Sequence, residues 1–482
     1  PVRTIGRSSG KTVAIIGSGP AGLTAAYHLA LAGHAVRIFE AAPQAGGMLK
    51  LTLPEYRLPN SVVDRDIANI TSLGVEIACN HPVGNLHKLR EEGFDAVFVA
   101  VGTHKTGKLD LPGSDMKGVV SCLDFLRDSK IGVKIDLTGK KVIVIGGGNT
   151  AMDSARTALR LGASGVSVIY RRSREEMPAW KEEIGEAEEE GVVLQFLRNP
   201  VRFIGRNGTI GQVVLVKMKL GEPDAGGRRK PVEISGSEYS EDVDFVVEAI
   251  GLSPTTSPFT GELELGKDGR IKVNATTMQA AEPWIFAGGD SVSGSSTIIE
   301  AAGQGKRAAF YMDKFLMGFE PGEFESGDKL PALDKMKVLS RPGIIPKPAL
   351  AEKFRPVLER IKDFEEVEST YTEEEVKQSA GRCLDCSNCR ECHQCITACP
   401  AYAIDFSQKK EAVQAYASAV IIASGFRLFN AAYKPQYSFD QLPNVIDSLQ
   451  MDRLIAPTRP FNNVLRPGDG KTPGNIAYVL CT

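Results

Sequence analysis

The sequence predicts an α/β fold in which one parallel-sheet unit is inserted into another and a small cysteine-rich segment follows. Two glycine-rich turns, at residues 17–22 and 146–151, each lie between an apolar run and a helical pattern. Six of the nine cysteines then occur within residues 383–399. Together these observations predict two Rossmann-like dinucleotide-binding domains and a metal-binding segment.

The first predicted unit begins with a buried strand at residues 13–16, a helix over 23–30 and a second strand at 35–39. The acid that follows this strand stands where a carboxylate can bind a ribose hydroxyl. The predicted dinucleotide-binding residues are Gly17, Gly19, Pro20, Ala21, Gly22 and Glu40. Gly46 and Gly47 follow. They either let the backbone approach the same pyrophosphate closely or belong to an ordinary loop.

The same plan returns with a strand at 142–145, a helix over 152–161 and a strand at 166–169. Arg171 and Arg172 stand in place of the ribose-binding acid, and guanidinium groups suit a phosphate, which favours NADP(H) over NAD(H) without excluding the latter. The alternative is a solvated face that pairs with Glu175 and Glu176. The predicted binding residues of this unit are Gly146, Gly148, Asn149, Thr150, Ala151, Arg171 and Arg172.

Apolar segments at 97–103, 246–251 and 284–290 end in small residues and read as strands whose tips approach a cofactor. They add Gly102, Gly251, Gly289 and Asp290 to the candidate site, and a helix is expected over 298–311. The expected divisions are 1–130 with 250–317 for FAD, 131–249 for NAD(P)H, 318–375 as a linker arm with one or two short helices, 376–408 as an iron-sulfur segment and 409–482 as a final segment. The acidic stretch 182–190 is expected to be a solvated helix face, or else a docking surface for a basic partner.

The cysteine run predicts iron-sulfur ligation. Its last four cysteines match the spacing C-x2-C-x2-C-x3-C-P of bacterial ferredoxins, which indicates one or two [4Fe-4S] clusters. Zinc is the alternative for the paired C-x2-C spacings. The candidate ligands are Cys383, Cys386, Cys389, Cys392, Cys395 and Cys399. Two clusters need more thiolates than the run contains, so Cys481 or a partner chain would have to contribute, whereas Cys79 and Cys122 are expected to be structural thiols.

Composition excludes some classes of function. The net charge of -2 offers no basic surface for nucleic acid, and no apolar run is long enough for a transmembrane helix. The N-terminus lacks the apolar core of a signal peptide, so a cytoplasmic protein is expected. Apolar segments at 419–425 and 476–480 read as strands, and the second would lack a partner, which suggests a fragment of a longer chain.

From residue 11 to about 307 the chain resembles the FAD- and NADPH-binding small subunit of glutamate synthase and its relatives in the two-dinucleotide-binding flavoprotein superfamily. The resemblance rests on residues 17–22, 54–59 (PEYRLP), 147–153 (GGNTAMD), 170–172 (YRR) and 287–290 (AGGD). It implies FAD in the first unit, NADPH in the second and hydride transfer between them, with no acid-base side chain required. Residues 403–482 resemble part of the flavin-binding subunit of heterodisulfide reductases, which implies redox partner proteins, with or without electron bifurcation.

The sequence therefore predicts an NAD(P)H-dependent flavin and iron-sulfur oxidoreductase that exchanges electrons with a partner protein. One alternative is a glutamate synthase small subunit. The other is a non-catalytic electron-relay subunit that keeps the fold but does not turn over nicotinamide.

Overall fold

The computed structural model describes residues 6–223, 227–319, 348–382 and most residues between 414 and 479. The described residues up to 382 belong to one unit, called the main unit here, and those from 414 onward belong to a second, C-terminal unit. None of the described helices combines the length and the apolar character that crossing a membrane would need.

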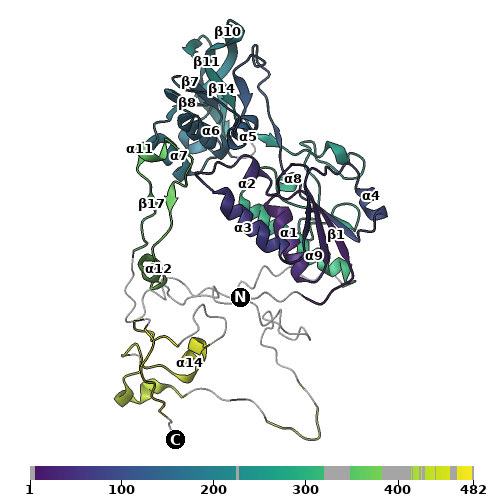
Figure 1. Ribbon diagram of the computed structural model, residues 1–482, viewed down its shortest axis with the longest axis vertical. Coiled ribbons are helices and arrows are strands. Elements are labelled where there is room, and N and C mark those ends of the chain that lie inside the picture. The colour runs from purple at the N-terminus through teal and green to yellow at the C-terminus, as the bar shows by residue number, and fades with distance from the viewer. Residues whose placement is uncertain are drawn as a thin grey trace. The chain divides into compact units, whose positions relative to one another are not determined.

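The first sheet of the main unit is parallel and has the strand order β16-β4-β1-β2-β3. Figure 1 labels β1 of this sheet. Its strands are β1 (Thr12–Ile16), β2 (Ala35–Phe39), β3 (Glu76–Ala78), β4 (Ala96–Val99) and β16 (Ile285–Ala287). In the register, Ile16 pairs with Phe39 of β2 and with Val99 of β4. The loops that follow β1, β2 and β4 therefore start at one edge of the sheet, where open parallel sheets bind their ligands.

Helices cover this sheet, and two of them approach each other very closely. The helices are α1 (Pro20–Leu31), α2 (Met48–Leu51), α3 (Asn60–Thr71), α4 (Leu86–Glu91), α8 (Asp290–Ser293) and α9 (Ile298–Leu316). A Cβ atom at Gly305 of α9 would lie 2.2 Å from the carbonyl oxygen of Ala21 in α1, so the small residue is what permits this contact. Phe98, Phe286 and Leu29 fill the core between helices and sheet, each with no exposed surface.

A second parallel sheet is inserted between β4 and β16 of the first, as expected, with the order β6-β14-β7-β8-β9. Its strands are β6 (Val119–Ser121), β7 (Lys141–Ile145), β8 (Gly165–Tyr170), β9 (Val193–Phe196) and β14 (Phe245–Glu248), and its helices are α5 (Cys122–Lys130), α6 (Asn149–Arg160) and α7 (Lys181–Glu189). Because β6 pairs with β14 and α5 packs against α6, this sheet unit begins before the expected boundary at residue 131. The α/β fold class with an inserted second unit is confirmed.

An antiparallel layer adjoins the second sheet and carries no motif that the sequence analysis used. It consists of β10 (Arg198–Arg206), β11 (Thr209–Pro223), β12 (Arg229–Glu233) and β13 (Tyr239–Asp242). Phe203 and Val213 of this layer pack against Ile143 and Ile169 of the second sheet. A short antiparallel pair, β5 (Lys105–Thr106) with β15 (Leu252–Ser253), lies where the chain passes between the two sheet units.

Residues 348–375 are the described part of the expected linker arm, and they contain α11 (Val357–Arg360), a short helix of the expected kind, and the start of α12 (Glu373–Ala380), which runs past the expected end of the arm. A strand pair, β17 (Lys353–Phe354) with β18 (Glu368–Ser369), brackets α11. The Val367 N–H donates to the carbonyl oxygen of Tyr56 at 2.9 Å, so the arm is bound to the main unit.

The C-terminal unit contains α14 (Ser448–Ile455). Two strands were predicted in this unit, and their described residues 419–422 and 476–479 are not in strands; Val420, Ile421 and Ile422 are 79%, 93% and 86% exposed. A strand is stable only when it pairs, and the described residues of this unit supply no neighbouring strand.

Candidate functional site

A cavity of about 450 Å³ lies at the edge of the first sheet where β1, β2 and β4 end. The predicted residues that line it are Gly17, Gly19, Pro20, Ala21, Glu40, Gly47, Gly102, Gly289 and Asp290. Gly22, Gly46 and Gly251 are not among the lining residues. The structure thus brings together predicted residues from four separate segments of the sequence.

The first glycine turn leaves open space on one side and none on the other. A Cβ atom at Gly22 would lie 2.0 Å from the carbonyl oxygen of Gly17, so the helix can begin here only with glycine at that position. At Gly19, which precedes the first residue of α1, a Cβ atom would meet no described atom within 4 Å. This open side at a helix N-terminus fits a pyrophosphate, which would accept hydrogen bonds from the free N–H groups and interact with the helix dipole.

Glu40 is held rigidly beside this turn. Its Oε2 accepts hydrogen bonds from Ser18 N at 2.9 Å and Ser18 Oγ at 2.5 Å, and its Oε1 accepts one from Ala42 N at 2.8 Å. Gly46 N in turn donates to Ser18 Oγ at 3.0 Å, and a Cβ atom at Gly47 would lie 2.8 Å from Gly19 Cα. Ser18 therefore joins the glycine turn, the acid and the 46–47 loop, although the sequence analysis gave it no role.

Asp290, the first residue of α8, also lines the cavity. Its Oδ1 accepts hydrogen bonds from Ser296 Oγ at 2.7 Å and Ser296 N at 3.2 Å. Burial raises the pKa of this carboxyl group, while the bonds from Ser296 oppose that rise. Its Oδ2 accepts only a long hydrogen bond, from Thr103 Oγ1 at 3.5 Å, and can also accept a hydrogen bond from a ligand hydroxyl.

The second glycine turn has the same construction as the first. A Cβ atom at Gly146 would lie 2.1 Å from the carbonyl oxygen of Ala249, whereas one at Gly148 would meet no described atom within 4 Å. Helix α6 begins directly after Gly148. Asn149 Oδ1 accepts a hydrogen bond from Trp180 N at 3.0 Å, so the segment before α7 is tied to the turn.

The two arginines proposed for phosphate binding have different surroundings. Arg171 is exposed at the end of β8, whereas Arg172 is buried and its Nε donates to the carbonyl oxygen of Arg229 at 2.8 Å. Nearby, Arg174 pairs with Glu188 rather than with Glu175 or Glu176. Arg171 is therefore the residue of this group that a nucleotide phosphate can reach, and its role stays a prediction.

The predicted cluster ligands, Cys383 to Cys399, and also Cys481, lie outside the described residues. Cys79 and Cys122 are free thiols, and burial raises the pKa of Cys122 to about 12 and raises that of Cys79 as well. Within the described ranges, no group of three or more histidine, cysteine or acidic side chains is placed to hold a metal ion.

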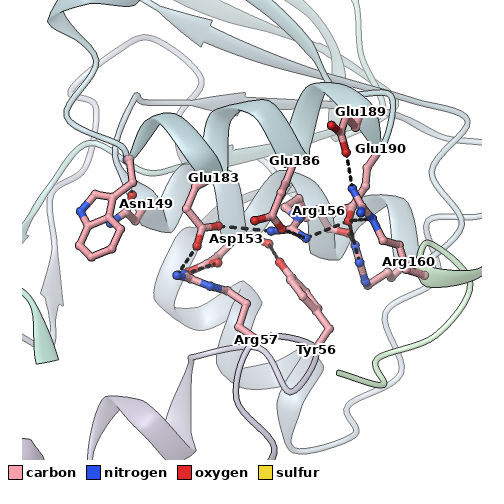
Figure 2. Close-up of polar contacts among 12 residues, drawn as sticks. Tyr56, Arg57, Asn149, Asp153, Arg156, Arg160, Glu183, Glu186, Glu189 and Glu190 are labelled. Carbon is pink, nitrogen blue, oxygen red and sulfur yellow. Dashed lines mark hydrogen bonds and ion pairs between the residues drawn. The ribbon is translucent and has the colours of Figure 1, made fainter. Parts of the chain in front are cut away.

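The acidic stretch 182–190 is solvated only in part: Glu182, Glu188 and Glu189 are exposed, as expected of a solvated face, but the other acids are not. Glu183 and Glu190 are buried and Glu186 is partly buried, and together they contact Arg57 and Arg156 (Figure 2). The sequence did contain a signal, because arginines spaced four apart on α6 match acids spaced three and four apart on α7. Without the tertiary contact, however, that pattern is indistinguishable from an exposed charged face.

Comparison with known proteins places these features in a family. The pyridine nucleotide-disulphide oxidoreductase family matches residues 11–305. The NADP(+)-dependent formate dehydrogenase subunit beta of Moorella thermoacetica is 45% identical over 390 residues, which is 79% of this chain and 55% of that protein. The NADPH-Fe(3+) oxidoreductase subunit beta of Geobacter sulfurreducens is 36% identical over 416 residues, or 78% of this chain and 61% of that protein. This chain thus spans little more than half the length of these two relatives.

Two further similarities concern the dinucleotide-binding part. The glutamate synthase [NADPH] small chain of Escherichia coli is 36% identical over 324 residues, covering 63% of this chain and 68% of that one. Among solved structures, FprA of Mycobacterium tuberculosis in complex with NADPH superposes with a TM-score of 0.57 at 20% identity, covering 65% of this chain and 85% of that chain. At that identity the likeness supports the fold alone. The fold, the paired glycine turns and the extent of the sequence match show that this chain belongs to the pyridine nucleotide-disulphide oxidoreductase family.

Proposed function

We propose that this chain is an electron-transfer subunit that moves electrons between NADP(H) and a partner protein, using FAD at the first glycine turn and one or two [4Fe-4S] clusters at the cysteine run. The observation that supports this most directly is the cavity at the first sheet, because its lining gathers nine of the residues predicted from sequence. A second turn of the same construction lies within the same unit.

The residues around the cavity suit FAD. The open side of the turn at Gly19 would receive the pyrophosphate, and Glu40 would accept a ribose hydroxyl while its bonds to Ser18 keep it in place. Asp290, which also lines the cavity, would bind a hydroxyl of the flavin side chain. In the second sheet unit, the turn at Gly148 would receive the NADP(H) pyrophosphate, and Arg171 would bind the additional phosphate.

When bound, FAD accepts a hydride as an electron pair and releases single electrons, which is what joins nicotinamide to iron-sulfur chemistry. The protein side chains bind and orient and do not donate or accept the reacting atoms. This is why the proposal names no catalytic acid or base.

The relatives favour this function over that of a glutamate synthase small subunit. An alignment of 390 residues is longer than the part of the chain that ends at residue 305, so the similarity to the formate dehydrogenase subunit must extend past the family match. The similarity to the glutamate synthase small chain covers less of this chain, 63%. We therefore propose that the partner is a redox subunit of the kind found with formate dehydrogenase or Fe(3+) reductase beta subunits.

An anaerobic titration with NADPH, and separately with NADH, tests the proposal. Flavin absorbance and the electron paramagnetic resonance signal of the clusters are followed together in the full chain. We expect NADPH to bleach the flavin and a reduced-cluster signal to appear, with NADH less effective. If neither nucleotide reduces the flavin although dithionite does, the chain is a relay subunit and the proposal fails.

A further inference from the structure

A buried cluster of charged residues joins the two sheet units and the linker arm. We call it the interdomain cluster, and it comprises Tyr56, Arg57, Asp153, Arg156, Arg160, Glu183, Glu186, Glu190 and Arg360 (Figure 2). Helices α6 and α7 of the second sheet unit supply most of these residues. The remainder come from a loop between α2 and α3 of the first unit and from α11 of the arm.

The first sheet unit contributes Tyr56 and Arg57 to this cluster. Arg57 Nη1 donates to both carboxylate oxygens of Asp153 at 2.9 and 3.1 Å, and its Nη2 pairs with Glu183. The ring of Tyr56 is 1% exposed and lies 3.9 Å from the guanidinium of Arg160. The guanidinium of Arg57 bonds to two acids from different helices at once, and the cation-π contact fixes the orientation of the Tyr56 ring. The contact therefore resists rotation of one sheet unit against the other.

The arm reaches the same helices from another direction. Arg360, which is 2% exposed, donates from Nε to Glu190 at 2.9 Å and from Nη2 to Glu189 at 3.1 Å. At the same time, Val367 N donates to the carbonyl oxygen of Tyr56 at 2.9 Å. The arm thus bonds to the second sheet unit through α11 and to the first sheet unit shortly after that helix. It therefore bridges the two sheet units.

Helix α6 connects this cluster to the second glycine turn. The helix begins at Asn149, beside the turn, and carries Asp153, Arg156 and Arg160 along one side. A helix is stiff over this length, so any rotation at the cluster is transmitted to the turn. A nucleotide bound at this turn would therefore change its direction relative to the first-sheet cavity whenever α6 rotates.

We propose that Arg57 and Arg360 are positioning residues that hold α6, and with it the second glycine turn, in one orientation relative to the cavity of the first sheet. This inference rests on the proposed function for its purpose, since the orientation serves transfer between a nucleotide and FAD. It also explains why charges are buried here at all. Buried ion pairs contribute little net stability compared with apolar packing, whereas their directional bonds select one arrangement.

Trp180 provides a test that does not depend on turnover. Its backbone bonds to Asn149, so it moves with the second turn, and the chain has only one other tryptophan, Trp284. In the flavin-loaded full-length chain carrying Trp284→Phe, energy transfer from Trp180 to flavin reports the distance between the two units. The flavin-free protein gives the reference lifetime. Arg57→Gln and Arg360→Gln are compared with Arg57→Lys.

A matched control is Arg355→Gln, because Arg355 lies in the same arm but pairs with Asp363, at 2.7 and 2.8 Å. We expect Arg57→Gln and Arg360→Gln to add a second, longer Trp180 lifetime, and Arg355→Gln to leave the single lifetime unchanged. Arg57→Lys should partly restore the single, shorter Trp180 lifetime. If the lifetimes stay unchanged while the unfolding temperature falls, the cluster serves stability only and the proposal is overturned.

Single-turnover flavin reduction by NADPH gives a second readout. Arg57→Gln should lower the rate constant about 10- to 100-fold, because a displacement of about 1 Å has effects of that size. The NADPH dissociation constant should stay nearly the same, since the binding residues are untouched. If the wild-type chain is not reduced by NADPH at all, the proposed function fails, and the lifetime measurement still decides the positioning role.

Discussion

Replacing Glu190 by glutamine should destabilise the second sheet unit strongly. Glu190 is the acid on which Arg156, Arg160 and Arg360 converge, with hydrogen bonds between 2.7 and 3.1 Å and a side chain that is 0% exposed. Glutamine has nearly the same shape, so the substitution removes the charge and leaves no cavity. The arginines then remain buried without their main counter-ion, which costs about 3–5 kcal/mol in comparable cases.

The pKa of Glu190 gives a second measure of the same effect. Burial raises this pKa, but hydrogen bonds from Arg160 and Arg156 outweigh it and lower the pKa from 4.5 to about 2. A shift of this size corresponds to about 3 kcal/mol. Because the folded-state pKa is depressed, this stabilisation is complete above pH 4.5 and is lost as the pH falls toward 2.

Thermal unfolding followed by Trp180 fluorescence in the Trp284→Phe background measures the prediction. At pH 7 the midpoint of Glu190→Gln should fall by about 10 °C, and the difference from the parent protein should shrink as the pH is lowered below 4.5. Glu189→Gln is the matched control, because the adjacent side chain is 64% exposed and should contribute under about 1 kcal/mol. Equal midpoints for the two variants, or a difference that grows on acidification, would refute the reasoning.

Four further predictions concern the proposed cofactors. Arg171→Ala should raise the KM for NADPH at least about tenfold and leave that for NADH unchanged, since only NADPH has the extra phosphate; equal effects in steady-state assays would contradict the assignment. Gly22→Ala should lower both stability and FAD content, because its Cβ would lie 2.0 Å from a backbone oxygen. Gly19→Ala, which meets no described atom, should keep the stability of the flavin-free protein but bind FAD more weakly by calorimetry, and unchanged affinity would argue against a pyrophosphate there. Cys389→Ser should lower the iron content of the purified protein, while Cys79→Ser should not; unaltered iron would remove Cys389 from the ligands.

The dinucleotide-binding turns could be predicted from the sequence because their physics is local. Gly17 and Gly22 meet within one turn, and the strand before them and the helix after them are neighbours in the chain. The strand at Ala35–Phe39 was predicted with its observed bounds for the same reason, since an apolar run between two turn signals marks a buried strand. Glu40 follows directly from that strand.

Local pattern does not decide which strands pair or which charged residues are buried. Residues 119–121 belong to the second sheet because β14, more than a hundred residues later, lies beside them. The strands expected at 419–425 and 476–480 lack such a neighbour within the described part of the C-terminal unit, and apolar character alone did not produce them.

The sequence by itself therefore determined the α/β class, the two glycine turns and the residues around the first of them. The tertiary structure alone decided that Glu183 and Glu190 are buried and that Arg57 and Arg360 reach them from distant segments. A charged side chain leaves water only when a partner compensates its lost hydration, and here the partners are up to 170 residues away in the chain. That compensation depends on the assembled fold, so it could not be predicted from the spacing of charges along one helix.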